Sequence, residues 1–506
     1  VAKADEEPPP DAGASTLARF YYARGKAANA IGRQLQYVED LRTAAGYDEQ
    51  STTSNSRLWS DLAWAESMVG NYKSAIRHMK RRVAAEDKNW GAQGNLTRML
   101  VRSGDMAAAE AAERRTLQLI DSSRRPHPWK PVMRAITRFS VLEGQGRYAE
   151  AEPLLRTAMA AFEEAGLAAE NPSWLENRRA DLARILRWQR RYVEAEIVAR
   201  DALLKALERS GKRSGTVARL VKDLGQILRS QGRYEDAEAL IRAAIEIYEK
   251  SGTPDESISL VATRAFLGFT LSAQEDWPAA IRAFEEARAA NPTAYDQYFR
   301  DSPGLALALL KTGETAEALD VLTAMYDRLE KRLGAKSDKT ALVGILLAVA
   351  QVAAGDREAA LANFSRALPI LTSRSRRSAD ESTSERERTR RVELALEPYI
   401  GLLADIGGSA LERKAGIDAV AEAFRVANLA RSGSVKGALA ESGARSLASN
   451  PDLADLVRRE QDARKQTAAL SALLADVLSG PTDQQDPKAV LDLKIRIDNL
   501  RGARAA

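Results

Sequence analysis

The residues best placed for chemistry are carboxylate pairs that recur along the chain. They occur in "AEAE" (149–152), "VEAE" (193–196) and "EDAE" (235–238). Two carboxylates this close could act as a general acid and a general base. Each pair, however, lies at the expected start of a helix, where anions complement the helix dipole and the unpaired backbone amides. The prediction for all three pairs is therefore a structural role.

Other catalytic and metal-binding side chains are scarce. The chain has no Cys and only two His, His78 and His127. Disulfides, thiolate metal sites and a cysteine nucleophile are thus excluded within these residues, and the histidines are expected to be exposed or packed. Glycine-rich phosphate loops, the HExxH zinc motif and the GxSxG nucleophile motif are also missing. We expect no catalytic residue, metal or cofactor, and hence no enzyme activity in this chain.

The composition favours an all-α protein. Ala, Leu, Arg and Glu are abundant, aromatic residues make up 6%, and Pro numbers 17 among 506 residues, which suits stacked helices. Lys plus Arg number 75 and Asp plus Glu 70, and this near balance does not indicate a nucleic-acid partner. No apolar run approaches the ~18 residues that a membrane span requires.

A phrase of the form G-x-Y-x-x-A sets the organisation of the chain. It recurs at intervals of 34 to 44 residues, which is the signature of a solenoid of helical hairpins. Its first position is occupied by Gly32, Gly70, Gly104, Gly146, Arg190, Gly232, Glu275, Gly313 and Gly355.

The unit around Gly232 shows what one repeat contains. Apolar residues recur at helical spacing over 220–228, and Ala237, Ile241 and Tyr248 continue an inward stripe in the next helix. Gly232 is predicted to end the first helix in the left-handed conformation. A hairpin of this size buries too few side chains to offset the entropy of its own ordering, so neighbouring hairpins must stack.

These features resemble a tetratricopeptide (TPR) array. "LWSDLAWAESMVGNYKSAI" and "FLGFTLSAQEDWPAAIRAFEEARAANP" supply the large, small, Gly and Ala positions of the family pattern, and the similarity covers about 17–371. The long period is similar to the extended TPRs of kinesin light chains. The resemblance implies a right-handed TPR superhelix, an α-α solenoid, that binds proteins.

The C-terminal part carries a second resemblance. "EAFRVANLARS" and "PDLADLVRREQD" look like the segment that joins TPRs to a CHAT domain in bacterial proteins, over about 415–506. CHAT domains are caspase-like modules with a His-Cys pair, but this chain has no Cys and stops where such a domain would begin. The resemblance therefore implies a repeat and linker portion, and no catalytic residue is transferred.

The predicted organisation has five segments. Phe424 and Ala427 still occupy TPR-like positions, and apolar residues at steps of three and four after 452 predict a C-terminal helical hairpin. The segments are a disordered leader (1–15), a TPR array of about nine hairpins (16–371), a polar charged insertion (372–391), an irregular final TPR-like repeat (392–440), and a helical hairpin or linker (441–506).

A basic groove is the predicted binding surface. In TPR proteins the first helix of each pair lines the concave face, and helical spacing puts residues 219, 222, 226 and 229 on one stripe away from the core. Cations there favour an acidic or carboxylate-bearing partner, although a merely solvated face is the simpler alternative. The groove set is Arg98, Arg102, Asn177, Arg184, Arg187, Arg219, Lys222, Gln226 and Arg229.

The functional prediction is a protein-protein interaction scaffold that holds a partner protein or peptide in the concave groove. If a CHAT domain adjoins it, the array would recruit substrates or regulate a protease. The alternative is a structural or oligomerisation module that pairs through the C-terminal hairpin, and the oligomeric state stays open. The polar start "VAKADEEPPP" fits either a processed exported protein or one that stays in the cytoplasm.

Overall fold

The computed structural model describes residues 2–30, 33–51, 56–69, 71–169, 171–212, 214–299, 303–374 and 383–431, with scattered positions between 459 and 500. Over these ranges the chain forms helices and turns without any β-strand. The predicted all-α class is thereby confirmed. None of the helices in the described part of the chain is long and apolar enough to cross a membrane.

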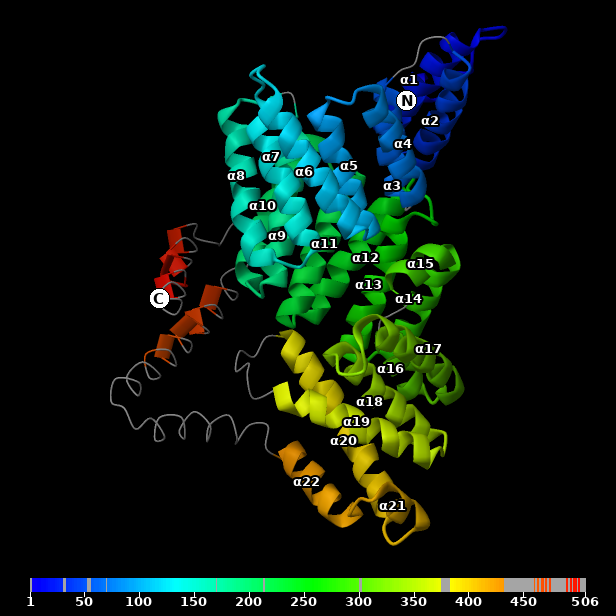
Figure 1. Cartoon of the computed structure of the whole chain (residues 1–506), viewed down its shortest axis with the longest axis vertical. Coiled ribbons are helices and arrows are strands. Elements are labelled where there is room, and N and C mark those ends of the chain that lie inside the picture. Colours follow the sequence, from blue (N-terminus) through cyan, green and yellow to red (C-terminus); the bar gives the residue numbers. More distant parts are fainter. Residues whose placement is uncertain are drawn as a thin grey trace. The chain divides into compact units, whose positions relative to one another are not determined.

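The chain divides into two compact units, Val1–Leu305 and Ala306–Ala506, coloured from blue through green to red in Figure 1. The first unit consists of successive helical hairpins preceded by a short 3-10 helix. Its helices are α1 (Ala14–Ala30), α2 (Gln34–Glu49), α3 (Ser56–Met68), α4 (Tyr72–Ala85), α5 (Trp90–Ser103), α6 (Met106–Ser122), α7 (Trp129–Gly144), α8 (Tyr148–Glu164), α9 (Pro172–Trp188), α10 (Tyr192–Ser210), α11 (Gly215–Gln231), α12 (Tyr234–Lys250), α13 (Ile258–Gln274), α14 (Trp277–Ala290) and α15 (Pro292–Tyr298).

The second unit continues the same hairpin pattern. Phe364 of α19 stacks on Tyr399 of α20 at 4.4 Å between ring centroids, and both rings are buried. Its described helices are α16 (Pro303–Thr312), which starts at the boundary, α17 (Thr315–Leu333), α18 (Asp338–Ala353), α19 (Arg357–Arg374), α20 (Thr383–Ile406), α21 (Ala410–Ala415) and α22 (Ala419–Arg431).

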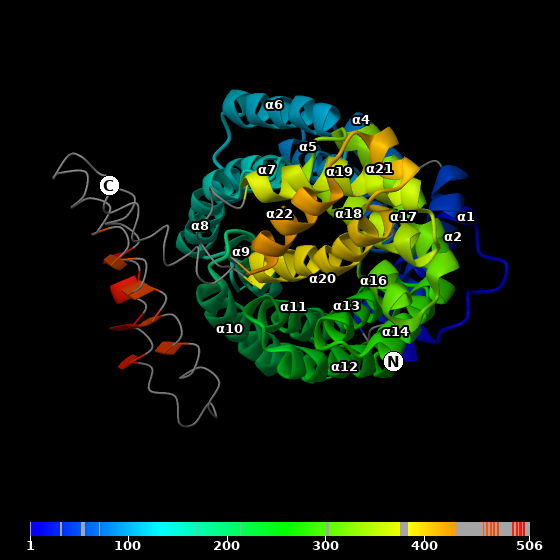
Figure 2. The ribbon, with the colours of Figure 1, turned by 90° about the horizontal axis from the view of Figure 1, so that it is seen from below.

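Two layers of helices build the first unit. Viewed along the stack in Figure 2, α7, α9, α11 and α13 lie on the inner side of the curve, and α8, α10, α12 and α14 lie on the outer side. The apolar stripe predicted for 220–228 is buried at Leu220, Leu224 and Ile227, and it packs against Ala237 of α12. The first helix of each pair is therefore free to present its opposite face to the inside of the curve.

Small residues let the two helices of a hairpin approach closely. A Cβ atom at Gly225 would lie 2.9 Å from Cγ1 of Ile241 and 3.2 Å from the backbone oxygen of Ala237. At Gly268 a Cβ would lie 2.8 Å from ring carbons of Phe284, which is itself buried. Both glycines stand in the small-residue position of the first helix, so the sequence pattern reports a true packing constraint.

The first position of the repeated phrase is left-handed wherever the structure describes it. This conformation ends the first helix and turns the chain into the second, and it strains any residue with a Cβ. The φ angles are +84° at Gly104, +74° at Gly146, +64° at Arg190, +85° at Gly232, +67° at Glu275, +86° at Gly313 and +82° at Gly355.

Replacement of Arg190 by glycine is expected to stabilise the protein by about 1 kcal/mol, because glycine adopts this conformation without the Cβ clash. The Arg190 side chain is exposed, so little packing is lost. The reverse change, Gly232→Ala, meets open space within 4 Å and should therefore lose a similar amount through backbone strain alone. Urea unfolding of the two variants checks this, and a lower midpoint for Arg190→Gly would contradict it.

The structure describes parts of the expected leader, the expected insertion and the C-terminal segments. Part of the expected leader lies against α1 and α2, because Ala4 is buried and its carbonyl accepts a hydrogen bond from Gln36. α20 begins at Thr383, whereas 375–382, at the centre of the expected insertion, and most of the expected hairpin at 441–506 lie outside the described residues. Phe424, expected at a repeat position, is 69% exposed on α22.

Candidate functional site

The recurring carboxylate pairs hold the solenoid together. In the first two pairs the first acidic residue bonds the arginine at the start of its own helix: Glu150 with Arg147 and Glu194 with Arg191, each at 2.7 Å. In the third, Arg233 bonds Asp236 at 2.9 Å. These arginines occupy N-cap positions but make no side-chain cap bond. The ion pair between each arginine and the acidic residue three positions later takes the place of a cap bond. These carboxylates are therefore engaged in a structural contact and are not placed as a free acid or base.

In two of the three phrases the second carboxylate, Glu152 or Glu196, links one hairpin to the next, whereas Glu238 of the third pairs with Arg242 on its own helix. Glu152 is buried and accepts hydrogen bonds from Gln189 at 2.9 Å and Arg191 at 2.7 Å. One repeat later, Glu196 is fully buried and accepts from Gln231 at 2.8 Å and Arg233 at 3.2 Å.

The same arrangement appears earlier in the unit, where Gln145 donates to Glu110 at 2.8 Å. Each glutamine directly precedes the left-handed residue, and each glutamate lies six positions after the left-handed residue of the preceding repeat. A ladder of charged hydrogen bonds therefore fixes the register between successive hairpins.

The predicted groove residues all lie on α5, α9 and α11, which are first helices of their pairs. They differ in what they already bind. Arg184 donates to Glu143 of α7 at 2.5 Å and to Asp181 at 2.8 Å. Arg219 donates to Asn177 of α9 at 2.5 Å. These two arginines therefore connect neighbouring first helices.

Other groove residues are less engaged. Arg98 lies over the ring of Trp64 at 4.9 Å, and Arg187 lies over Trp188 at 4.6 Å. No carboxylate that the structure describes forms an ion pair with Arg98, Arg102 or Arg187. Gln226, by contrast, is only 7% exposed, so it has little surface left for a partner.

The field on this face is positive. Burial lowers the pKa of Arg98 to about 9, and the charges of Arg178 and Arg102 act in the same direction. Burial likewise lowers the pKa of Arg187 to about 10, with a further contribution from Arg229. Both guanidinium groups remain charged at neutral pH. Burial is the main cause of both shifts, and neighbouring cations add to it.

Carboxylates buried among these cations show the opposite effect. Burial by itself would raise the pKa of Asp181, but the charges of Arg178, Arg184 and Arg219 outweigh burial and hold that pKa well below its usual range. Asp223 behaves in the same way between Lys222 and Arg219. The groove is therefore a mixed network in which cations exceed carboxylates, rather than the purely basic stripe that the sequence suggested.

Sequence reasoning missed four members of this network. Arg178 is buried, with 9% exposed, and its Nη2 donates to Asp181 at 2.9 Å. The repeat does carry a usable signal, because Asp181 and Asp223 are 42 residues apart at the same repeat position. The missed residues are Glu143, Arg178, Asp181 and Asp223.

The histidines and aromatic residues mostly have packing roles. His78 lies 5.5 Å from the buried Trp59, and burial lowers its pKa. Trp188 is 51% exposed and stacks on Tyr148 at 5.9 Å. Within the described residues, no group of three or more His, Asp and Glu side chains could hold a metal ion.

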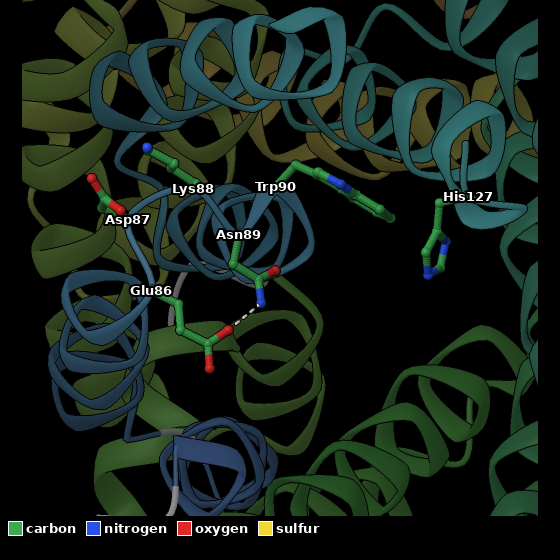
Figure 3. A pocket seen from close by; sticks show the side chains of 6 residues that line it. All are labelled: Glu86, Asp87, Lys88, Asn89, Trp90 and His127. Carbon is green, nitrogen blue, oxygen red and sulfur yellow. Dashed lines mark hydrogen bonds between the residues drawn. The ribbon is translucent and has the colours of Figure 1, made fainter. Parts of the chain in front are cut away.

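A shallow cavity of about 580 Å³ lies between the α4–α5 and α6–α7 connections, away from the groove. In Figure 3, Trp90 and His127 approach each other from two segments, and Glu86 and Asn89 are joined by a hydrogen bond. The Trp90 and His127 rings meet edge to face at 5.3 Å, and His127 Nδ1 accepts a bond from the Trp129 amide. Glu86, Asn89, Trp90 and His127 of the lining contact one another in pairs, and the lining does not form a catalytic arrangement.

Solved structures of repeat proteins resemble this chain. BtubC (BKLC) from P. vanneervenii is 20% identical, with 46% of this chain and 92% of that chain covered and a TM-score of 0.34. TPR-like repeats from Podosopora anserina, assigned to a kinesin light chain, are 20% identical over 41% of this chain and all of that one, with a TM-score of 0.33. A Rap protein complexed with Competence and Sporulation Factor is 15% identical over 72% of this chain and 99% of that chain, with a TM-score of 0.43.

Sequence comparison with family models is more decisive. No curated protein matches the sequence, but the model of the MalT-like TPR region matches residues 65–373. This range covers more than half of the chain and includes α5, α9 and α11 with the whole groove. TPR-like repeats are typically non-catalytic scaffolds that mediate protein-protein interactions. The hairpin stack, its left-handed turns and this match together show that the chain belongs to the MalT-like TPR family.

Proposed function

We propose that the first unit binds an acidic segment of a partner protein along the inner faces of α5, α9 and α11. The observation that carries the proposal is the excess of cations over carboxylates on these faces. Arg98, Arg102 and Arg187 rest on tryptophan rings instead of carboxylates. An acidic side chain would gain charge-assisted hydrogen bonds there, and the rings would support it with apolar contact.

The rigidity of the face supports this function. Arg184 connects α7 to α9, and Arg219 connects α9 to α11. The ladder of charged hydrogen bonds between glutamine and glutamate side chains connects the hairpins of the same repeats. A preorganised surface loses little entropy when a partner binds. Several neighbouring repeats can therefore contribute to affinity at once.

Selection from a displayed random-peptide library, followed by binding measurements with the full chain, tests this function. We expect the selected peptides to be rich in Asp and Glu, and the affinity to fall at least about tenfold in an Arg102→Glu, Arg187→Glu variant. These positions avoid the ion-pair network, whereas reversal of Arg184 or Arg219 would disturb the fold. An Arg114→Glu, Arg115→Glu variant on the exposed side of α6, which changes the net charge equally, is the matched control. Equal losses of affinity in the two variants would contradict binding of the peptide in the groove.

We further propose that the chain has a regulatory role beside a CHAT-type protease. This role rests on the resemblance of 415–506 to the segment that joins TPRs to such domains, of which α22 is the described part. In such an arrangement the groove would hold the substrate or a controlling segment while the protease acts.

A further inference from the structure

The most crowded cations of the groove come from α5 and α9. Arg98 and Arg102 are one turn apart on α5 and share one support, because their guanidinium carbons lie 4.9 Å and 5.5 Å from the Trp64 ring centroid. Arg102 also donates to Ser67 Oγ at 3.4 Å. Within the described residues Ser67 is the hydrogen-bond acceptor shown for this pair, so most of their N–H donors are open to a ligand.

A third guanidinium, that of Arg178 on α9, lies over the ring of Trp174 at 5.5 Å, and its charge acts on Arg98. Its residue is nine-tenths buried, its Nη2 bonds Asp181, and its buried Nε has no hydrogen-bond partner. An unsatisfied buried donor on a charged group is energetically costly unless a ligand completes it. The charges of Arg178 and Arg102 both act on Arg98, and the charge of Arg102 acts on Arg178, so the three lie within one electrostatic neighbourhood.

The nearby carboxylates are already committed. Asp181 and Glu143 are the anions that act on Arg98, but Asp181 also bonds Arg178 and Arg184, and Glu143 also bonds Arg184. Two carboxylates shared in this way leave the arginines incompletely neutralised. The positive charge of the arginines exceeds the negative charge of Asp181 and Glu143 by more than one further carboxylate would neutralise.

We propose that Arg98, Arg102 and Arg178 bind the phosphoryl group of a phosphorylated partner segment in the groove. A phosphoryl group carries close to two negative charges and three acceptor oxygens at neutral pH, which matches several guanidinium donors better than a carboxylate does. The unsatisfied Nε of Arg178 would donate to one oxygen. This proposal rests on the proposed function and specifies the chemistry of its ligand.

Three immobilised peptide libraries with the same degenerate flanks, carrying phosphoserine, glutamate or serine at the central position, test it with the full chain. We expect at least about tenfold more retention on phosphoserine than on serine, and several-fold more than on glutamate. Inorganic phosphate at constant ionic strength should compete. Arg102→Gln and Arg98→Gln should each remove the preference for phosphoserine, with Arg115→Gln as the control.

The outcomes separate the two proposals. Equal retention on phosphoserine and glutamate, lost in Arg102→Gln, would overturn the phosphoryl inference and leave the acidic-partner function intact. A phosphoserine preference that survives Arg102→Gln would overturn the assignment of the site. No retention on either acidic library, together with no selected peptide, would overturn both proposals. Arg102 is exposed, so its substitution remains decisive if Arg98→Gln fails to fold.

Discussion

Replacement of Glu196 by alanine is expected to destabilise the protein by about 3 kcal/mol. Glu196 is fully buried, and its carboxylate receives Arg200 at 2.7 Å, Gln231 at 2.8 Å and Arg233 at 3.2 Å. Removal of the carboxylate leaves these donors without their shared acceptor at the junction of two hairpins. Partly buried cations that lose their only buried anion are a large source of instability.

The chain supplies a matched control at the same repeat position. Glu238 lies six residues after Gly232, as Glu196 lies six after Arg190, and it pairs with Arg242 on its own helix at 2.8 Å. The Arg242 side chain is 55% exposed, so Glu238→Ala should cost less than about 1 kcal/mol. Urea unfolding followed by circular dichroism measures both. Similar losses for the two variants would show that the ladder adds nothing beyond local helix charge.

Substitution of Asp181 by asparagine is expected to destabilise the first unit by about 2–3 kcal/mol near neutral pH. Asp181 bonds Arg178 at 2.9 Å and Arg184 at 2.8 Å, and its own side chain is 14% exposed. An amide keeps the shape and can accept one bond, but it cannot balance the charges of the buried Arg178 and the partly exposed Arg184. The loss should appear in the urea midpoint of the first unit.

The pH dependence of the same variant gives an independent readout. Since folding lowers the pKa of Asp181, its contribution is fully present above the unfolded pKa of about 3.8 and is lost as the pH falls below it. The parent should therefore lose more stability than Asp181→Asn between about pH 5 and pH 2. Asp201→Asn, whose carboxylate is 45% exposed between Arg179 and Lys205, should change stability by less than about 1 kcal/mol. Parallel acid limbs for parent and Asp181→Asn would contradict the prediction.

The two effects bear on the proposed function in different ways. The ladder around Glu196 sets the spacing of the hairpins, and Asp181 sets the position of the arginines on the inner face. A groove that reads charge must hold its cations in place against their mutual repulsion. Shared carboxylates provide that restraint while leaving an excess of positive charge for a partner.

Part of the groove could be found from the sequence. The rule that first helices line the inside, with steps of three and four, assigned Arg98, Arg184 and Arg219 to first helices, and the structure places them on α5, α9 and α11. It could not tell that Arg184 and Arg219 are engaged with Glu143 and Asn177, 41 and 42 residues away. Contacts between helices that are one repeat apart depend on the angle and offset at which hairpins stack. Local periodicity contains neither quantity.

The sequence by itself determined the period, the order of helices and the left-handed turn at Gly232, and it aligned Arg190 and Glu275 with that position, where the structure shows the same conformation. It did so because helical spacing and turn conformation depend on near neighbours in the chain. Only the tertiary structure decided that Glu196 is a buried junction rather than a helix-end charge, and that Arg184 bonds Glu143 of the neighbouring first helix. Burial and long-range charge interaction depend on what the stacked neighbours place around a side chain, and that is fixed only when the hairpins pack.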